Sequence, residues 1–293
     1  MSRIRIIILA ALLFTEFGQV SSAEQAESLV LPIGIYDTQV LPLNLASKIS
    51  ECPDPRRFDY DNNQVVAELV LLCNALKVGG LNPQLDFKNT PDYLRIITNS
   101  SDGQTVMPGF VVWRQDINSD LFYISEPVLK KKEYTKGIYT SANRRDLLKV
   151  RDERALKSHS VAANPNWEHD AAEIKCLELK PITGPFNPIS MARMVAAERA
   201  DFLLYPFFKT ADLKGTLGDV KLTPLTGVKV AFNDSLHFIV SKKNPQGAMV
   251  HAALQKGLAQ LHAQGTIHYV YEQIGFFNPH VKNWQELGCK TIQ

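Results

Sequence analysis

Short apolar runs alternate with apolar positions at helical spacing along most of the chain. Residues 29–36 (LVLPIGIY) form a run rich in β-branched residues, which predicts a buried strand. Asp61 and Gln64 resemble a capping box at the start of a helix, and Gly79-Gly80 end that helix in the usual way. Apolar side chains recur at helical spacing between these two signals, at Val65, Leu69, Cys73 and Leu76.

The same alternation continues to the end of the chain. Further strands are predicted at 85–88, 106–113, 137–141, 158–163, 202–207 and 237–241. Further helices are predicted at 91–97, 166–179 and 187–200, and two more close the chain on either side of Gly265. Strands that alternate with helices favour parallel sheets, so we expect an α/β fold.

The N-terminal segment has the layout of a secretory signal peptide. Arg3 and Arg5 precede an apolar run at 6–14, and the small residues Ser21-Ser22-Ala23 follow. A retained membrane anchor is the alternative, but the run is shorter than the roughly 20 residues that a membrane span needs. We therefore expect residues 1–23 to be removed after Ala23 and the mature protein to be soluble in the periplasm.

Composition and charge exclude several classes of protein. The chain has 293 residues, of which 45% are hydrophobic and 21% charged, with a formal net charge of +2. These values are typical of a globular protein and give no basic footprint for a nucleic acid. The lysine run at 130–132 is expected to be a solvated surface. We expect a monomer of one large domain or two smaller ones.

Four cysteines in an exported chain raise the question of disulfide bonds: Cys52, Cys73, Cys176 and Cys289. Cys52 lies in a proline-rich loop just before the helix that carries Cys73, so Cys52–Cys73 is the preferred local pair. A buried free thiol at Cys73 is the alternative. The sequence supports no firm prediction for Cys176–Cys289. The cysteine and histidine spacings do not fit zinc, and we expect no metal or cofactor.

Four segments resemble the type II periplasmic solute-binding proteins, the family that includes polar amino acid receptors of ABC importers. They occur in the family's order and are spread along the chain from residue 123 to residue 267. The segments are 123–128 (YISEPV), 197–202 (AERADF), 236–242 (LHFIVSK) and 258–267 (LAQLHAQGTI).

The resemblance implies two α/β lobes joined by two crossover strands, near 138–140 and 237–240, with a ligand held between the lobes. Lobe one would comprise residues 24–138 plus 238–293, and lobe two residues 139–237. Clefts between domains are favoured ligand sites, and hinge closure around a ligand suits such an architecture.

The chain departs from the family at both charged anchors for an amino acid. The family's arginine for the substrate carboxylate falls on Asn118, and its aspartate for the ammonium group falls on Tyr205. We therefore expect a small polar organic ligand that is not held by the usual α-amino acid clamp.

Candidate ligand contacts in lobe one lie just after predicted strands. Arg114 could grip a carboxylate or phosphate, or it could be a surface arginine. Tyr36 and Asp37 end the first strand, where α/β sheets expose their ligand crevice, although both also suit a turn. Trp113 could line the cleft or belong to the core.

Lobe two offers three more candidates. Gly184 and Asn187 precede a predicted helix, where free amide groups suit an anion, but a capped surface turn fits the sequence equally well. Tyr205 ends a predicted strand and could present its hydroxyl and ring to a polar ligand, or pack in the core.

Three function classes follow from these observations. The first is a solute-binding protein that delivers its ligand to an ABC-type importer. The second is a ligand sensor that acts on a membrane receptor. The third is an exported hydrolase, which stays open because catalytic groups can assemble from distant residues. The sequence contains no G-x-S-x-G, H-E-x-x-H, Walker or G-x-G-x-x-G motif, so we do not expect an enzyme.

Overall fold

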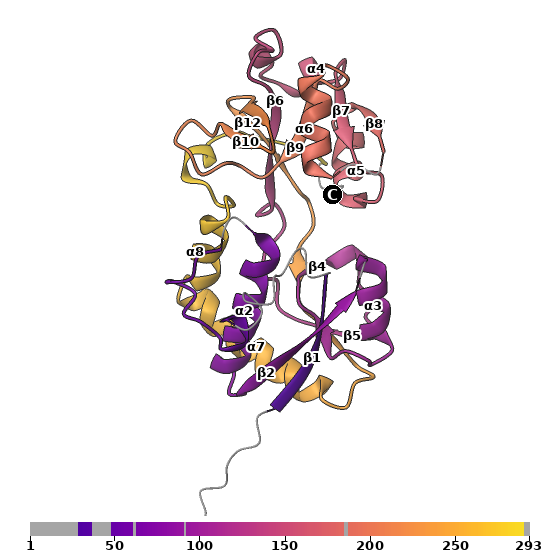
Figure 1. Ribbon diagram of the computed structural model, residues 1–293, viewed down its shortest axis with the longest axis vertical. Helices are drawn as coiled ribbons and strands as arrows, with labels where there is room; N and C mark the ends of the chain where they lie inside the picture. The colour runs from indigo at the N-terminus through magenta and orange to yellow at the C-terminus, as the bar shows by residue number, and fades with distance from the viewer. Residues whose placement is uncertain (1–28, 37–47, 61–62, 91, 185–186, 290–293) are drawn as a thin grey trace, which may run out of the picture.

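The computed structural model describes residues 29–36, 48–60, 63–90, 92–184 and 187–289, which form two lobes stacked along the long axis of the molecule (Figure 1). The expected signal peptide, Asp37 and Asp61 lie outside the described residues. The two-lobed α/β architecture confirms the expected fold class. Within the described ranges, no helix combines the length and apolarity needed to cross a membrane.

Lobe one is built on a parallel sheet of order β2-β1-β3, with helices on both faces. On β1 (Leu29–Tyr36), the odd-numbered residues Leu31 and Ile33 are fully buried in the cluster that contains α2. Gly34 lies on the opposite face and leaves room for Ile96 of α3. Lobe one contains β2 (Pro83–Thr90), β3 (Met107–Pro108), α2 (Gln64–Val78), α3 (Tyr93–Ser101), α7 (Gly247–Ala263) and α8 (Thr266–Gln273).

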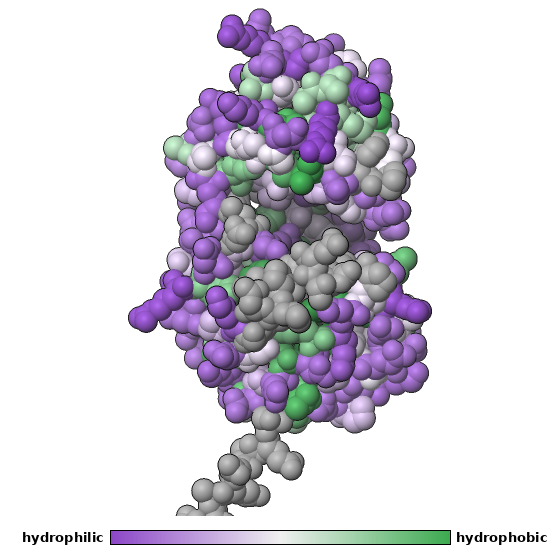
Figure 2. Space-filling view, in the orientation of Figure 1, coloured by the Kyte–Doolittle hydropathy of each residue, from purple (hydrophilic) through white to green (hydrophobic). Residues whose placement is uncertain are grey.

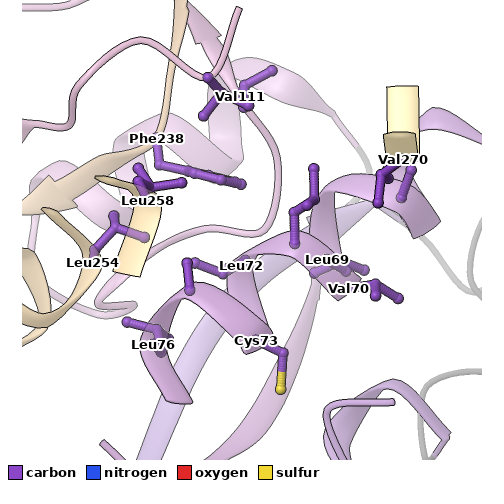
Figure 3. Close-up of a cluster of buried hydrophobic side chains, with 14 of the residues drawn as sticks. Leu69, Val70, Leu72, Cys73, Leu76, Val111, Phe238, Leu254, Leu258 and Val270 are labelled. Carbon is purple, nitrogen blue, oxygen red and sulfur yellow. The ribbon is translucent and has the colours of Figure 1, made fainter. Parts of the chain in front are cut away.

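Helices α2 and α7 pack along each other in the core of lobe one. Figure 3 shows apolar side chains of both helices meeting Val111, Phe238 and Val270. Glycines make the close approach possible, because a Cβ added at Gly257 would lie 1.8 Å from the carbonyl oxygen of Ala75. A Cβ added at Gly79 would lie 2.0 Å from the carbonyl oxygen of Ala253. The two backbones are therefore in direct contact.

Lobe two is built on a mixed sheet of order β10-β11-β6-β9-β7-β8, with β12 pairing to both β6 and β15. Helices α5 and α6 lie on opposite faces, because their apolar residues belong to two separate clusters. The strands are β6 (Thr135–Ser141), β7 (Ser160–Ala163), β8 (Lys180–Thr183), β9 (Phe202–Tyr205), β10 (Gly215–Leu217), β11 (Val220–Pro224), β12 (Val228–Ala231) and β15 (Gln285–Leu287). The helices are α4 (Glu153–Leu156), α5 (Glu168–Cys176) and α6 (Pro188–Ala196).

Two neighbouring segments connect the lobes. One runs from β5 (Phe122–Ile124) to β6, and the other from β12 to β13 (Leu236–His237) and β14 (Ile239–Ser241). Backbone hydrogen bonds join them, including one from the Phe232 amide to the Tyr134 carbonyl at 3.0 Å. Because β6 pairs with lobe-two strands from Thr135 onward, the pairing favours a first boundary before that residue. The expected boundaries at 138/139 and 237/238 remain a proposal.

The C-terminal segment makes a third crossing. It leaves α8 in lobe one, and β15 then pairs in parallel with β12 of lobe two (Figure 1). Cys289 is bonded to Cys176 of α5. The end of the chain is therefore attached to lobe two by a strand pair and a disulfide bond.

Several elements differ from their predicted bounds for local reasons. The side chain of Asn63 accepts the hydrogen bond from the Val66 amide at the start of α2. The strand predicted at 106–113 is interrupted, because the Val111 amide donates to the Glu68 carboxylate instead of a neighbouring strand. The pieces are β3 and β4 (Val112–Trp113). Helix α6 ends at Ala196, since Glu198 takes a left-handed conformation with φ 57°.

Both cysteine pairs are bonded in the structure. The Cα atoms of Cys52 and Cys73 lie 5.2 Å apart, which confirms the predicted bond. The Cα atoms of Cys176 and Cys289 lie 5.1 Å apart, in a pair for which the sequence supported no prediction.

Peptide mapping tests this pairing. Protein alkylated before digestion should yield the linked peptides Cys52–Cys73 and Cys176–Cys289 and no alkylated cysteine. Reduction before alkylation should label all four residues and serves as the control. Alkylation of any cysteine in the unreduced protein would contradict the pairing.

Candidate functional site

Aromatic side chains meet where the lobes come together, and Trp113 is at their centre. Trp113 ends β4 of lobe one, and its ring stacks on His169 of α5 in lobe two, with centroids 4.3 Å apart and an interplanar angle of 21°. The same ring contacts Tyr134 and Phe232 of the two connecting segments, at 5.0 and 5.6 Å. Trp113 thus packs against the cores of both lobes and joins them.

An acidic side chain reinforces this contact. Asp116 lies on the 3₁₀ turn Arg114–Asp116 that follows β4, and both of its carboxylate oxygens lie 3.1 Å from Nε2 of His169. A protonated Nε2 donates to the carboxylate, and a fully protonated ring completes an ion pair. Lobe one and lobe two are therefore linked by one polar and one stacking contact to the same histidine.

A buried ion pair lies on the lobe-two side. Nζ of Lys136 on β6 lies 2.6 Å from Oδ1 of Asp170 on α5, and the two side chains are only 7% and 14% exposed. The ammonium group also lies over the rings of Tyr134, Trp167 and Phe232. Burial is the largest influence and opposes the charge of Lys136, but Asp170, together with Tyr134 and Tyr205, raises the pKa of the ammonium above its ordinary value. Lys136 is therefore charged at neutral pH.

The topology of lobe two explains why these groups meet. The chain leaves β7 for α5 on one face of the sheet, and leaves β8 for α6 on the other face. The carboxyl ends of β7 and β9 thus form the point where the direction of winding changes, the usual position of a ligand crevice. Strand β6 is antiparallel to β9, with Gly137 opposite Tyr205, so Lys136 lies at the same end.

Tyr205 lies at this end of the sheet. It is partly buried, packs on Phe208 with ring centroids 5.5 Å apart, and lies close enough to Lys136 for the ammonium charge to influence its hydroxyl. Burial raises the pKa of the Tyr205 hydroxyl, and the neighbouring ammonium lowers it by a smaller amount. The hydroxyl is neutral at pH 7 and serves as a hydrogen-bond group.

Arg114 lies between Trp113 and Asp116 on the lobe-one side of the contact. Its backbone amide donates to the Ser235 carbonyl at 2.8 Å, and its side chain is exposed. In the described part of the chain, Arg114 forms no ion pair within 4.0 Å. Burial and, to a smaller extent, the nearby charge of Arg114 lower the pKa of His237. The other lobe-one candidate in the described chain, Tyr36, ends β1 beside Thr90 of β2.

The remaining candidates lie at the start of α6. The side chain of Asn187 accepts a hydrogen bond from the Ser190 amide at 2.8 Å and so caps the helix. Gly184 follows β8, and its amide lies 3.4 Å from the Ala163 carbonyl. The helix cap that belongs to the alternative is present, at the end of the sheet that carries Tyr205.

A buried carboxyl lies below the contact region in lobe one. Glu68 of α2 is 2% exposed and accepts hydrogen bonds from the Val111 amide, the Tyr271 hydroxyl and Gln64. Burial raises its pKa from 4.5 to about 7, although these hydrogen bonds oppose the shift. Val111 directly precedes β4, so Glu68 fixes the backbone that carries Trp113 and Arg114.

The surface is hollowed where the lobes meet (Figure 2). A separate open groove of about 510 Å³ lies in lobe two, between α5 and the strands β7 and β8. Mostly apolar residues line this groove, and none of the candidate ligand contacts in the described part of the chain is among them. We place the candidate site at the contact between the lobes because charged and aromatic groups of both lobes meet there. Among the described residues, no group of three or more His, Cys, Asp or Glu is arranged to hold a metal ion.

The sequence made Trp113, Arg114 and Tyr205 candidates but not the charged residues that lie next to them in the structure. Lys136, His169 and Asp170 gave no motif, because their partners lie far away in the sequence. The Lys136–Asp170 contact spans 34 positions, and the His169–Asp116 contact spans 53. One signal was present in the sequence: Lys136 lies within a strand, and all residues from Thr135 to Thr140, the lysine included, are buried in the structure.

No protein-family model matches this sequence, and the search of curated proteins found no match. Solved structures of the same architecture do match. Substrate-binding domain 2 of GlnP from Lactococcus lactis, in an open conformation, matches with a TM-score of 0.54 and 15% identity. The match covers 85% of this chain and 96% of that domain.

Two further solved structures with this fold come from proteins of different kinds. The probable amino-acid ABC transporter extracellular-binding protein ytmK of Bacillus subtilis matches with a TM-score of 0.57 and 12% identity, over 86% of this chain and 99% of that one. The periplasmic VFT2 domain of BvgS from Bordetella pertussis matches with a TM-score of 0.52 and 14% identity, over 83% and 93%. At these identities the likeness is one of fold.

Proposed function

We propose that this protein is an exported solute-binding protein that captures a small polar organic ligand between its lobes. The observation that carries the proposal is the contact region around Trp113, where side chains from both lobes and both connecting segments meet. Sites between domains are favoured for small ligands, and two-lobed proteins close on a ligand by hinge motion. Residues 1–23 are proposed to direct export and to be removed after Ala23.

The ligand is proposed to carry an anionic or carbonyl-rich end. Arg114 is exposed, lies beside the contact region and forms no ion pair with the described residues, so its guanidinium is free to bind a carboxylate. Tyr205 supplies a neutral hydroxyl where the related receptors have an aspartate. An amino acid zwitterion needs both of its charges met, because an unpaired buried charge is costly.

A ligand screen tests this proposal. Thermal-shift measurements on the purified mature protein should find stabilisation by an organic acid or a carbonyl-rich compound, and none by common L-amino acids. A ligand at 100 times its Kd stabilises the fold by about 2.7 kcal/mol, which such measurements detect.

An arginine comparison tests the role of Arg114. Arg114→Ala should weaken the ligand found in the screen at least about tenfold in calorimetry, because a hydrogen bond to a charged group contributes about 1.5–3 kcal/mol. Arg145→Ala is the matched control, since Arg145 is an exposed arginine that follows β6 at the opposite end of the strand from Lys136. Equal affinity of the Arg114 and Arg145 variants would contradict the proposed role.

A sensor that acts on a membrane receptor is the second candidate function. The likeness to the BvgS periplasmic domain favours it, whereas the likeness to GlnP and ytmK favours delivery to an importer. Both functions use the same ligand site in a monomer. Ligand-dependent association of the purified protein with a permease encoded beside its gene would establish delivery. The same association with a membrane sensor kinase would establish sensing.

A further inference from the structure

The surroundings of the Lys136 ammonium have the composition of a binding site for a cation. Asp170 accepts one hydrogen bond at 2.6 Å. The rings of Tyr134, Trp167 and Phe232 lie with their centroids 5.7, 5.5 and 5.4 Å from Nζ. A carboxylate combined with several aromatic faces is how proteins recognise ammonium ligands, since each ring attracts a cation within about 6 Å. We call these four residues the ammonium cage.

The ammonium cage lies where the two connecting segments meet lobe two. Tyr134 and Phe232 come from the two connecting segments, and Trp167 and Asp170 come from the start of α5 in lobe two. Trp113 of lobe one contacts both Tyr134 and Phe232. The cage is therefore continuous with the contact region that we propose as the ligand site.

We propose that Lys136 is a tethered ammonium group that permanently fills the cation-binding part of the interlobe site, so that the site selects ligands without an ammonium group there. This inference rests on the proposed function and names its specificity-determining residue. A free amino acid would need a counter-charge for its ammonium, but Asp170 is already neutralised and Tyr205 is uncharged. A carboxylic acid or a neutral carbonyl compound carries no such requirement.

A purely structural role for the ion pair makes a different prediction. Buried ion pairs are often no more stabilising than apolar side chains of similar size. If the role of Lys136 were only structural, any side chain that fills the same space could replace it. The ammonium cage instead requires a cation at this position. Removing the lysine side chain should therefore create a receptor for a small alkylammonium ion.

Chemical rescue of Lys136→Ala distinguishes the two roles. The atoms removed beyond Cβ are three carbons and the ammonium group, so the matching probe is n-propylammonium. We expect the variant to melt below the wild type, and about 100 mM n-propylammonium to restore about half of the lost melting temperature. Propan-1-ol, and sodium chloride at the same ionic strength, should restore much less. The wild type and Lys136→Met, whose side chain fills the same space, should not respond to the amine.

A second variant separates the contribution of the Asp170 carboxylate to amine binding from that of the aromatic rings. Lys136→Ala combined with Asp170→Asn should lose most of the response to n-propylammonium. If Lys136→Ala does not stay folded, its refolding yield from urea, with the amine compared with the alcohol, gives the same comparison. Equal rescue by amine and alcohol, or no rescue by either, would overturn the proposal.

The outcome is independent of the identity of the natural ligand. A wild-type protein that binds no compound in the screen would contradict the proposed function and leave the rescue result unchanged. Binding of a common L-amino acid to the wild type, lost in Asp170→Asn, would overturn the tethered-ammonium inference and leave the interlobe site intact.

Discussion

Replacing Gly257 by alanine should lower the free energy of unfolding by about 3 kcal/mol, the upper end of the cost of overpacking a core. The added Cβ would lie 1.8 Å from the Ala75 carbonyl oxygen, which belongs to backbone and cannot rotate away. Helices α2 and α7 must then separate, and the cluster between them loosens. At a solvent-exposed helix position the same change would stabilise the protein by about 1 kcal/mol. A loss of stability in Gly257→Ala would therefore indicate the close contact between the helices.

Two matched variants support this measurement. Ala252→Gly, at an exposed position of α7, should cost about 1 kcal/mol and calibrates the effect of helix propensity. Gly79→Ala acts on the same helix contact, so the variant with both alanines should cost less than the sum of the two single changes. Urea denaturation followed by circular dichroism measures the wild type and the four variants. A Gly257→Ala protein as stable as the wild type would show that the helices are not in direct contact.

The second large effect is a pH dependence of stability that arises from Glu68. Its pKa is about 7 in the folded protein and 4.5 without burial. The folded state therefore holds the proton over a range in which the unfolded chain has lost it. Between about pH 4.5 and 7 the Glu68 contribution to stability falls as the pH rises, and it is constant outside that range. From pH 5 to pH 8 the loss should be about 2–3 kcal/mol.

Glu68→Gln isolates this contribution. The amide has the same shape, does not titrate and can still accept from the Val111 amide. Urea denaturation at pH 5 and pH 8 should show that the difference in unfolding free energy between wild type and variant changes by about 2–3 kcal/mol in favour of the variant. Glu51→Gln, an exposed residue of lobe one, should show no such change. A difference that stays constant with pH would contradict the assignment.

The parts of the fold that the sequence predicted well are those specified by local patterns. Strand β1 has its predicted bounds, and α2 ends at Gly79 as expected. The strands β10, β11 and β12 were missed, because they are three to five residues long and are interrupted by glycine, proline and lysine. Their stability comes from pairing with β6 and with one another, which is a non-local property.

The candidate site shows the same division. Trp113 and Tyr205 were found because each ends a strand, and strand ends are visible in the sequence. The charged residues of the site could not be predicted in this way. Asp170 and His169 lie in the first turn of a helix, and the polar sequence of that turn is typical of a solvent-exposed surface. Only the packing of α5 against β6 and lobe one brings them to the contact region.

The third crossing between the lobes restricts the mechanics of the molecule. Two adjacent connecting segments alone would let the lobes both bend and twist about a narrow waist. A third strand of chain, fastened to lobe two by β15 and by the Cys176–Cys289 bond, acts as a tether displaced from that axis. Such a tether opposes torsion more than bending, so it favours a single path of opening. The Cys176–Cys289 bond holds the far end of this tether on α5 of lobe two.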